Sequence, residues 1–282
     1  MTTPDGARLC VETFGDPRDR AVLLVGGAAS SMDYWEDGFC AQLAAGGRHV
    51  IRFDARDTGR STTWPIGEPG YTGADLAADP IVVLDGLGVE RAHLVGISMG
   101  ASIVASLASR HPERVLTLTI ASGSPGGDDL PPPSADVAPS FVEPPPEIDW
   151  SDRAAVAGRL VDDLRGFTGS LPFDEDHARS VVARVLAHSP APAAANNHWL
   201  VVGGDSDEQA TDLAAIAAPT LVWHGSADPL FPLPHGEAFR DRIPNARLVV
   251  LEGVGHEYPP PSTWEIVVSE LLAHTTDPHA RQ

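Results

Sequence analysis

The pentapeptide GISMG, centred on Ser98, has the residue types of a nucleophile for attack on a carbonyl group. It follows an apolar run over 92–97, typical of a buried strand, and precedes a helical pattern over 99–112. A serine in a sharp strand-to-helix turn is exposed in a strained conformation, and the helix start offers free N–H groups to developing negative charge. Gly96 and Gly100 are required because side chains there would clash with the neighbouring strand or helix. The alternative is a tight structural turn, since 27 glycines can give this spacing by chance.

A serine nucleophile needs a base, and the base needs a carboxylate that orients it. Asp228 follows the predicted strand 219–225, and His256 follows the predicted strand 246–253. Sites in open α/β sheets gather at the carboxyl ends of the strands. We therefore expect Ser98, Asp228 and His256 to meet there as nucleophile, orienting acid and general base.

Other residues could take the roles of base and acid. His224, at the end of its strand, is the rival base, and Asp128 or Asp129, after the strand 115–121, is the rival acid. Asp228 is preferred for its tight loop and the proline that follows it. A single loop aspartate is usually a cap or turn residue, and a single histidine is usually structural. The catalytic interpretation therefore depends on the order Ser98, Asp228, His256, with each residue at the end of a successive strand.

Two backbone N–H groups are expected to stabilise the oxyanion that forms when the serine attacks. Met99, directly after the serine, supplies the first by its position. Ala28 supplies the second, because Gly26 and Gly27 before it let the backbone approach the substrate. The alternative is that these glycines only end the strand 21–25. This chemistry uses neither a cofactor nor a metal ion, and we expect none.

Short apolar runs alternate with helical patterns in the first part of the chain and again in the last part. This alternation is typical of a mostly parallel sheet flanked by helices. The predicted strands are 21–25, 49–54, 92–97, 115–121, 219–225 and 246–253. An opening hairpin or edge pair is expected over 6–15, and Pro80 is expected to kink or restart one helix.

Between the two parts, the sequence is first rich in proline and then amphipathic over 152–188, with two or three predicted helices. We therefore predict an α/β core of residues 1–124 and 213–282. Residues 125–212 are expected to form a Pro-rich helical cap inserted between two core strands. Four aromatic residues of this insertion are expected either to line an apolar pocket or, more commonly, to pack in a core: Trp150, Phe167, Phe173 and Trp199.

GISMG, the HGSADP loop at Asp228, the GVGH segment at His256 and the turn FDARDTGRS over 53–61 together resemble the α/β-hydrolase superfamily. The RDTGRS part is similar to bacterial methylesterases of anthracycline polyketides such as aclacinomycin. The resemblance covers about 8–123 and 213–275, and its motifs are more specific for the superfamily than for a substrate.

The resemblance implies a catalytic triad of Ser98, Asp228 and His256, and an oxyanion hole made by the N–H groups of Ala28 and Met99. It implies the α/β-hydrolase fold and a serine carboxylic-ester hydrolase that forms an acyl-enzyme, including a methylesterase for a polyketide-type natural product. The alternatives are a cofactor-free perhydrolase with the same triad and a ligand-binding protein that kept the fold without turnover.

Gly26 stands where many superfamily members have a histidine, and the methylesterase relatives also lack that histidine. Arg56 and Asp57 are expected to order the turn beside the site without a catalytic role.

Charge excludes several classes of partner. The chain has 19 Lys+Arg against 39 Asp+Glu, a formal net charge of −20. This balance disfavours nucleic acid and anionic membrane surfaces, and strongly anionic substrates would be repelled. A neutral or cationic small-molecule ester is therefore expected as the substrate. The sequence has no apolar run long enough to span a bilayer and no signal pattern, so a soluble cytoplasmic protein is expected, with Cys10 and Cys40 as buried free thiols.

Overall fold

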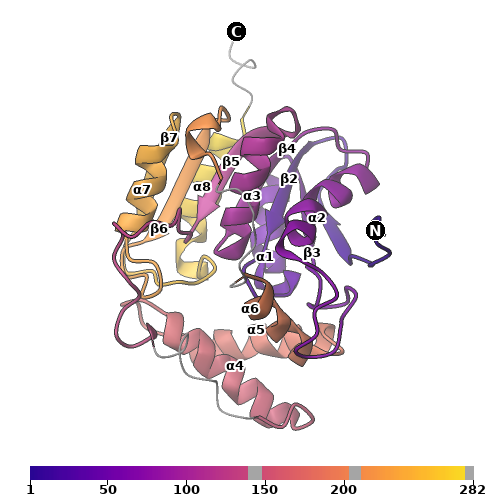
Figure 1. The fold of residues 1–282 in the computed structure, drawn as a ribbon. Helices are drawn as coiled ribbons and strands as arrows, with labels where there is room; N and C mark the ends of the chain where they lie inside the picture. The colour runs from indigo at the N-terminus through magenta and orange to yellow at the C-terminus, as the bar shows by residue number, and fades with distance from the viewer. Residues whose placement is uncertain (139–147, 203–210, 277–282) are drawn as a thin grey trace.

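A seven-stranded sheet forms the centre of the molecule (Figure 1). The computed structural model describes residues 1–138, 148–202 and 211–276. The strands, in chain order, are β1 Val11–Phe14, β2 Arg20–Val25, β3 Arg48–Phe53, β4 Ala92–Ile97, β5 Val115–Ala121, β6 Thr220–Gly225 and β7 Ala246–Leu251. Their order across the sheet is β1-β3-β2-β4-β5-β6-β7, and every neighbouring pair is parallel except β1 with β3. The predicted mostly parallel sheet is confirmed.

The first strand is an edge strand. It pairs antiparallel with β3, from Val11 opposite Phe53 to Phe14 opposite Val50. Of the two arrangements expected for the start of the chain, the structure therefore has the edge pair and not a hairpin with the strand that follows.

Helices cover both faces of the sheet. The core helices are α1 Asp37–Ala45, α2 Gly73–Gly86, α3 Met99–Arg110, α7 Pro234–Arg242 and α8 Trp264–His274. Residues of α2, α3 and α7 share one buried cluster, whereas residues of α1 and α8 share another. Among the described residues, no helix is long and apolar enough to cross a membrane.

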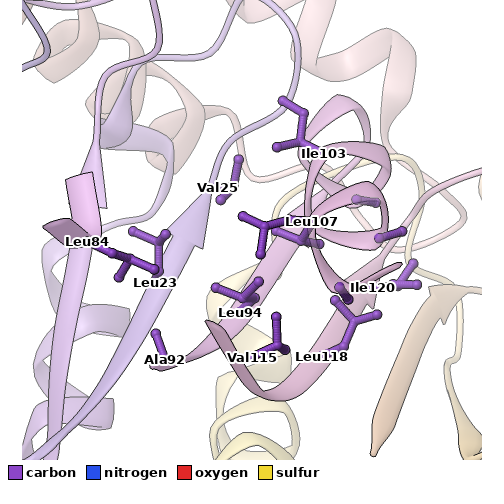
Figure 2. Packing of buried hydrophobic residues seen from close by; sticks show 14 of the residues in the cluster. Leu23, Val25, Leu84, Ala92, Leu94, Ile103, Leu107, Val115, Leu118 and Ile120 are labelled. Atoms are coloured by element: carbon purple, nitrogen blue, oxygen red, sulfur yellow. The ribbon is translucent and has the colours of Figure 1, made fainter. Parts of the chain in front are cut away.

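Successive side chains of the central strands point to opposite faces of the sheet and so pack alternately in these two clusters. Leu23 and Leu94 are fully buried and pack on the same face as Leu107 of α3 (Figure 2). Val22 and Val95 point to the opposite face and pack in the cluster that contains α1 and α8. Complete burial of such side chains contributes about 1.5 to 3 kcal/mol each, so the sheet is a rigid base for the loops at its ends.

Helix α2 contains Pro80 and is nevertheless continuous. Proline removes one helical N–H donor and so weakens the helix interior. The helix is held at its start by a capping box, in which the Asp75 N–H donates to the Thr72 hydroxyl and the Thr72 N–H donates to the Asp75 carboxylate. Its apolar face is buried through Leu76 and Val83. The expected restart at Pro80 therefore does not occur.

A helical insert connects β5 to β6. Its helices are α4 Arg153–Phe167, α5 Glu175–His188 and α6 Asn197–Val202. In Figure 1, α4 and α5 lie as a separate layer below one end of the sheet, with α6 between them and the core. The first two helices match the amphipathic stretch predicted over 152–188, whereas α6 lies beyond it. Part of the predicted Pro-rich stretch, residues 139–147, lies outside the described residues.

The helices α4 and α5 have a small core of their own, made by residues such as Val156, Val182 and Leu186. Trp150 and Phe173 pack against it, which is the core role expected for most aromatic residues of the insertion.

Candidate active site

Ser98 lies in the turn between β4 and α3 and has φ +54° and ψ −118°. A positive φ is uncommon for a residue with a side chain and costs on the order of 1 to 3 kcal/mol. The surrounding backbone holds this conformation, because the Ser98 N–H donates to the Ala121 carbonyl (3.0 Å) and the Ser98 carbonyl accepts from the Ala101 N–H (2.9 Å). The sequence therefore produces the strained strand-to-helix turn that the GISMG spacing predicts.

The two glycines of this turn have no room for a side chain. A Cβ added to Gly96 would lie 2.1 Å from the carbonyl oxygen of Gly100. A Cβ added to Gly100 would lie 2.4 Å from the carbonyl oxygen of Val25 in β2. Backbone atoms cannot move aside as a flexible side chain could, so both positions require glycine for the reason predicted from the sequence.

A continuous series of hydrogen bonds joins the three residues expected to act together. The His256 Nε2 lies 3.0 Å from the Ser98 Oγ, and the His256 Nδ1 lies 2.9 Å from the Asp228 Oδ2. An ionised carboxylate only accepts hydrogen bonds, so Nδ1 carries the proton and Nε2 is free to accept the serine proton. The arrangement can therefore deprotonate Ser98 as it attacks an electrophile.

Asp228 is held in place from its other oxygen. Its side chain is fully buried, and Oδ1 accepts from the N–H groups of Leu230 (2.9 Å) and Phe231 (2.8 Å). Two hydrogen bonds fix the carboxylate plane, which leaves Oδ2 pointed at the imidazole. Phe231 also packs edge-on against the His256 ring, with centroids 5.3 Å apart.

The rival base and the rival acids do not take part in this series, although the His224 Nε2 lies 3.6 Å from the Asp228 Oδ2. His224 is buried, its Nε2 donates to the Phe231 carbonyl (2.7 Å), and burial lowers the pKa of His224. This ring therefore braces the Asp228 loop. Asp128 and Asp129 are exposed at the surface, where Asp129 forms an ion pair with an arginine of α7 (3.0 Å).

The backbone donors expected to bind an oxyanion lie on either side of the serine. Met99 is the first residue of α3, and Ala28 lies in the loop after β2. Within the described part of the chain, neither N–H has a hydrogen-bond acceptor. A Cβ built on Gly27 would lie 3.4 Å from the Ser98 Cβ, so this loop is in contact with the serine.

The turn after β3 is ordered by the two residues expected to order it. The Arg56 guanidinium pairs with the carboxylates of Asp79 (2.9 Å) and Asp5 (2.6 Å). The Asp57 carboxylate accepts from the Trp64 N–H (2.6 Å). Both side chains are therefore occupied in holding the turn.

The insert contacts the site directly. The backbone N–H of His256 donates to the backbone carbonyl of Phe167 at the end of α4 (2.8 Å), and the centroids of the two rings lie 5.9 Å apart. Phe167 is thus placed at the site, whereas Trp199 is half exposed.

Sequence reasoning missed two residues that touch the loop carrying Ala28. The Tyr258 hydroxyl accepts from the Gly27 N–H, and the His198 ring accepts from the Ala29 N–H. Tyr258 lies only two residues beyond His256, which was the one local signal available. His198 had none, because it lies in a stretch without a recognisable motif.

One group among the described residues has the ligand types for a metal ion: Cys10, Asp54 and His188, whose ligand atoms lie within 4.8 Å of one another. The Asp54 carboxylate already accepts from the backbone N–H groups of Met32 and Arg60 (2.9 Å each) and from the His188 ring (2.6 Å). The group is therefore a hydrogen-bonded contact between α5 of the insert and the core.

This contact predicts a pH-dependent stability. Asp54, which accepts a hydrogen bond from the ring, raises the pKa of His188. Protonated His188 thus stabilises the fold fully below the unfolded pKa of about 6.5, and this stabilisation is lost as the pH rises through the folded pKa. We expect His188→Gln to lower the free energy of unfolding by about 1 kcal/mol at pH 5.5 and by less at pH 8.5, measured by urea unfolding.

The exposed His111 provides the control for this measurement. His111→Gln should change the free energy of unfolding little at either pH. An equal effect of His188→Gln at both pH values would contradict the assignment of a charged contact.

Comparisons with known proteins agree with this fold. A family model described as "alpha/beta hydrolase fold" matches residues 20–258. The chain is 34% identical to rhodomycin D methylesterase DauP of Streptomyces sp. (strain C5) and 33% identical to rhodomycin D methylesterase DnrP of Streptomyces peucetius. Each match covers 98% of this chain and 97% of the relative. A hydrolase from Pseudomonas aeruginosa PA01 has a similar structure, with a TM-score of 0.70, 26% identity, and coverage of 98% of this chain and 97% of that one.

Proposed function

The chain belongs to the α/β-hydrolase family, and from this premise we propose that it is a serine-dependent carboxylic ester hydrolase that works through an acyl-enzyme. The observation that carries the proposal is the series of hydrogen bonds from Ser98 through His256 to Asp228 at a strained strand-to-helix turn. A serine next to a base that is itself oriented by a buried carboxylate is the arrangement that activates a hydroxyl for acyl transfer.

In the first half-reaction, the Ser98 Oγ attacks the ester carbonyl carbon while its proton moves to the His256 Nε2. Asp228 keeps the proton on Nδ1 and stabilises the imidazolium ion that forms. The tetrahedral intermediate collapses when the carbon–oxygen bond to the alcohol breaks, and His256 returns its proton to the departing alcohol. The products of this half are the free alcohol and an acyl group on Ser98.

The negative charge on the carbonyl oxygen is received by the N–H groups of Ala28 and Met99. Met99 begins α3, so the partial positive charge at the helix start adds to the two hydrogen bonds. One such donor is worth on the order of 100-fold to 1000-fold in rate. In the second half-reaction, His256 takes a proton from water as the water oxygen attacks the acyl carbon. The bond from that carbon to the Ser98 Oγ then breaks, His256 returns the proton to Oγ, and the carboxylic acid leaves.

We further propose that the core of 1–124 and 213–282 carries the chemistry and that the insertion 125–212 acts as the cap of the substrate pocket. The contact of the Phe167 carbonyl with the His256 N–H supports this division, because it places the end of α4 against the base.

For the substrate, we propose the methyl ester of a polyketide-type natural product, processed in antibiotic biosynthesis. The similarity to two rhodomycin D methylesterases over 98% of the chain supports this class. The net charge of −20 favours a neutral or cationic ester over an anionic one.

A comparison of ester classes tests this function. Wild-type protein is given p-nitrophenyl acetate, a long-chain aliphatic methyl ester, and rhodomycin D, with methanol or p-nitrophenol release as the readout. We expect kcat/KM for the polycyclic methyl ester to exceed that for the aliphatic methyl ester by about 10-fold or more, because a shaped apolar pocket discriminates by such amounts. Hydrolysis of the aliphatic ester alone would contradict the substrate class. Bromination of a dye in acetate and peroxide without ester hydrolysis would contradict the ester hydrolase itself.

A further inference from the structure

The loop after β2 has its backbone held by two side chains from distant parts of the chain. The Gly27 N–H donates to the Tyr258 hydroxyl (2.9 Å), and the Ala29 N–H donates to the His198 Nδ1 (2.9 Å). Between them, the Ala28 N–H has no acceptor in the described residues. Of three consecutive N–H groups, the outer two are thus fixed and the middle one is left for a ligand.

This loop needs external support. Ala29 has φ +56°, a left-handed conformation that is uncommon for alanine. Gly26 and Gly27 precede it and restrict the backbone little. The turn within the loop is weak, since the Ser30 N–H lies 3.4 Å from the Gly27 carbonyl. The position of the Ala28 N–H therefore depends on the two side chains that fix its neighbours.

His198 is held in a single hydrogen-bonding state. It is completely buried on α6, and its Nε2 lies 2.7 Å from the Arg56 carbonyl. A carbonyl can only accept, so Nε2 carries the proton and Nδ1 presents its lone pair to Ala29. Burial lowers the pKa of His198, which favours the neutral ring that this arrangement requires.

Tyr258 is fixed by aromatic packing. Its ring stacks on Tyr34 (centroids 5.4 Å apart) and meets Trp35 edge-on (5.0 Å). A Cβ at Gly26 would lie 3.1 Å from the Tyr258 hydroxyl oxygen, so glycine at this position leaves the space that the hydroxyl needs. Tyr258 also shares a loop with His256, and it thereby links the base to the loop that carries Ala28.

We propose that His198 and Tyr258 are positioning residues that hold the Ala28 N–H toward the substrate carbonyl oxygen, so that the insert completes the oxyanion hole. The proposal rests on the proposed ester hydrolysis and adds to it a role for α6. An oxyanion forms only after attack, so a misplaced donor lowers kcat and leaves KM nearly unchanged.

Two substitutions of His198 separate its two hydrogen bonds. His198→Asn places an amide oxygen near the position of Nδ1 and keeps the acceptor for Ala29. His198→Gln places its amide group near the position of Nε2, which keeps the donor to Arg56 and removes the acceptor for Ala29. We expect kcat to fall about 10-fold to 100-fold in His198→Gln and to stay within about 3-fold of wild type in His198→Asn, with KM changed little in both.

Tyr258→Phe removes only the hydroxyl and should lower kcat by a similar factor. Affinity for a trifluoromethyl ketone, which binds as an oxyanion adduct of the serine, should fall with kcat in both the Gln and the Phe variants. The positioning role would be overturned if His198→Asn and His198→Gln lost kcat equally and in proportion to a fall in melting temperature. Unchanged kcat in His198→Gln and Tyr258→Phe would overturn it too. If the wild-type protein had no Ser98-dependent turnover, the proposed function itself would be overturned. If the wild type were active and the variants were unaffected, only the positioning role would be overturned.

Discussion

Ser98→Ala is expected to reduce kcat for ester hydrolysis by about a million-fold, the scale on which removal of a serine nucleophile acts in hydrolases with this arrangement. The substitution removes the Oγ that would form the bond to the acyl carbon. It leaves His256 and Asp228 in contact, and it leaves the N–H groups of Ala28 and Met99 available. Steady-state kinetics on an activated ester gives the measurement.

The Ser98→Ala protein should remain folded, because the Ser98 N–H and carbonyl keep their backbone hydrogen bonds. Ser102 offers a matched control, since it is an exposed serine of α3, the helix that begins directly after Ser98. Ser102→Ala should hydrolyse the ester at the wild-type rate. A Ser98→Ala protein with wild-type kcat would refute the assignment of the nucleophile.

Asp228→Asn is expected to lower kcat by about 10,000-fold, with the fold retained. The N–H groups of Leu230 and Phe231 both point at Oδ1, so the amide oxygen of the new side chain will occupy that position. Its NH2 group must then face the His256 Nδ1, where it can only donate. The imidazole proton is thereby moved to Nε2, and His256 can no longer accept the proton of Ser98.

The competing assignment of the acid is tested with the same substitution at the surface. Asp129→Asn changes an exposed residue that pairs with Arg242 and should keep full activity. Loss of activity in Asp129→Asn together with a fully active Asp228→Asn would reverse the assignment.

The fold and the meeting of Ser98, Asp228 and His256 at the strand ends were predictable because their signals are local. Most strands are short apolar runs, and Ser98, Asp228 and His256 each lie within five residues of the end of such a run. Parallel pairing then brings the strand ends together, so positions along the chain translate into neighbours in space. Gly96 and Gly100 were predictable for a local reason too, because a side chain at either position would clash with the adjacent strand or helix.

The supports of the Ala28 loop were not predictable in this way. His198 and Ala29 are 169 residues apart, and neither carries a pattern that indicates the other. The helix α6 is only six residues long, too short for a clear periodicity. Likewise, the continuity of α2 through Pro80 depends on its capping box and its buried face, which offset a local signal.

Several hydrogen bonds link the described parts of the insert to the core, and those of His198 and Phe167 reach the loops of the site. The His188 ring meets Asp54, the His198 ring meets the Ala28 loop, and the Phe167 carbonyl accepts from the His256 N–H. Each contact is a directional hydrogen bond, so the positions of the insert helices and of the core loops depend on one another.

The covalent role of Ser98 is tested most directly by rapid-quench mass spectrometry during turnover of an ester whose acyl-enzyme is hydrolysed slowly. We expect a mass increase equal to the acyl group on the peptide that contains Ser98, formed at the rate of alcohol release and missing in the Ser98→Ala protein. Continued alcohol release with no adduct on that peptide, or with the adduct on another residue, would contradict the covalent role.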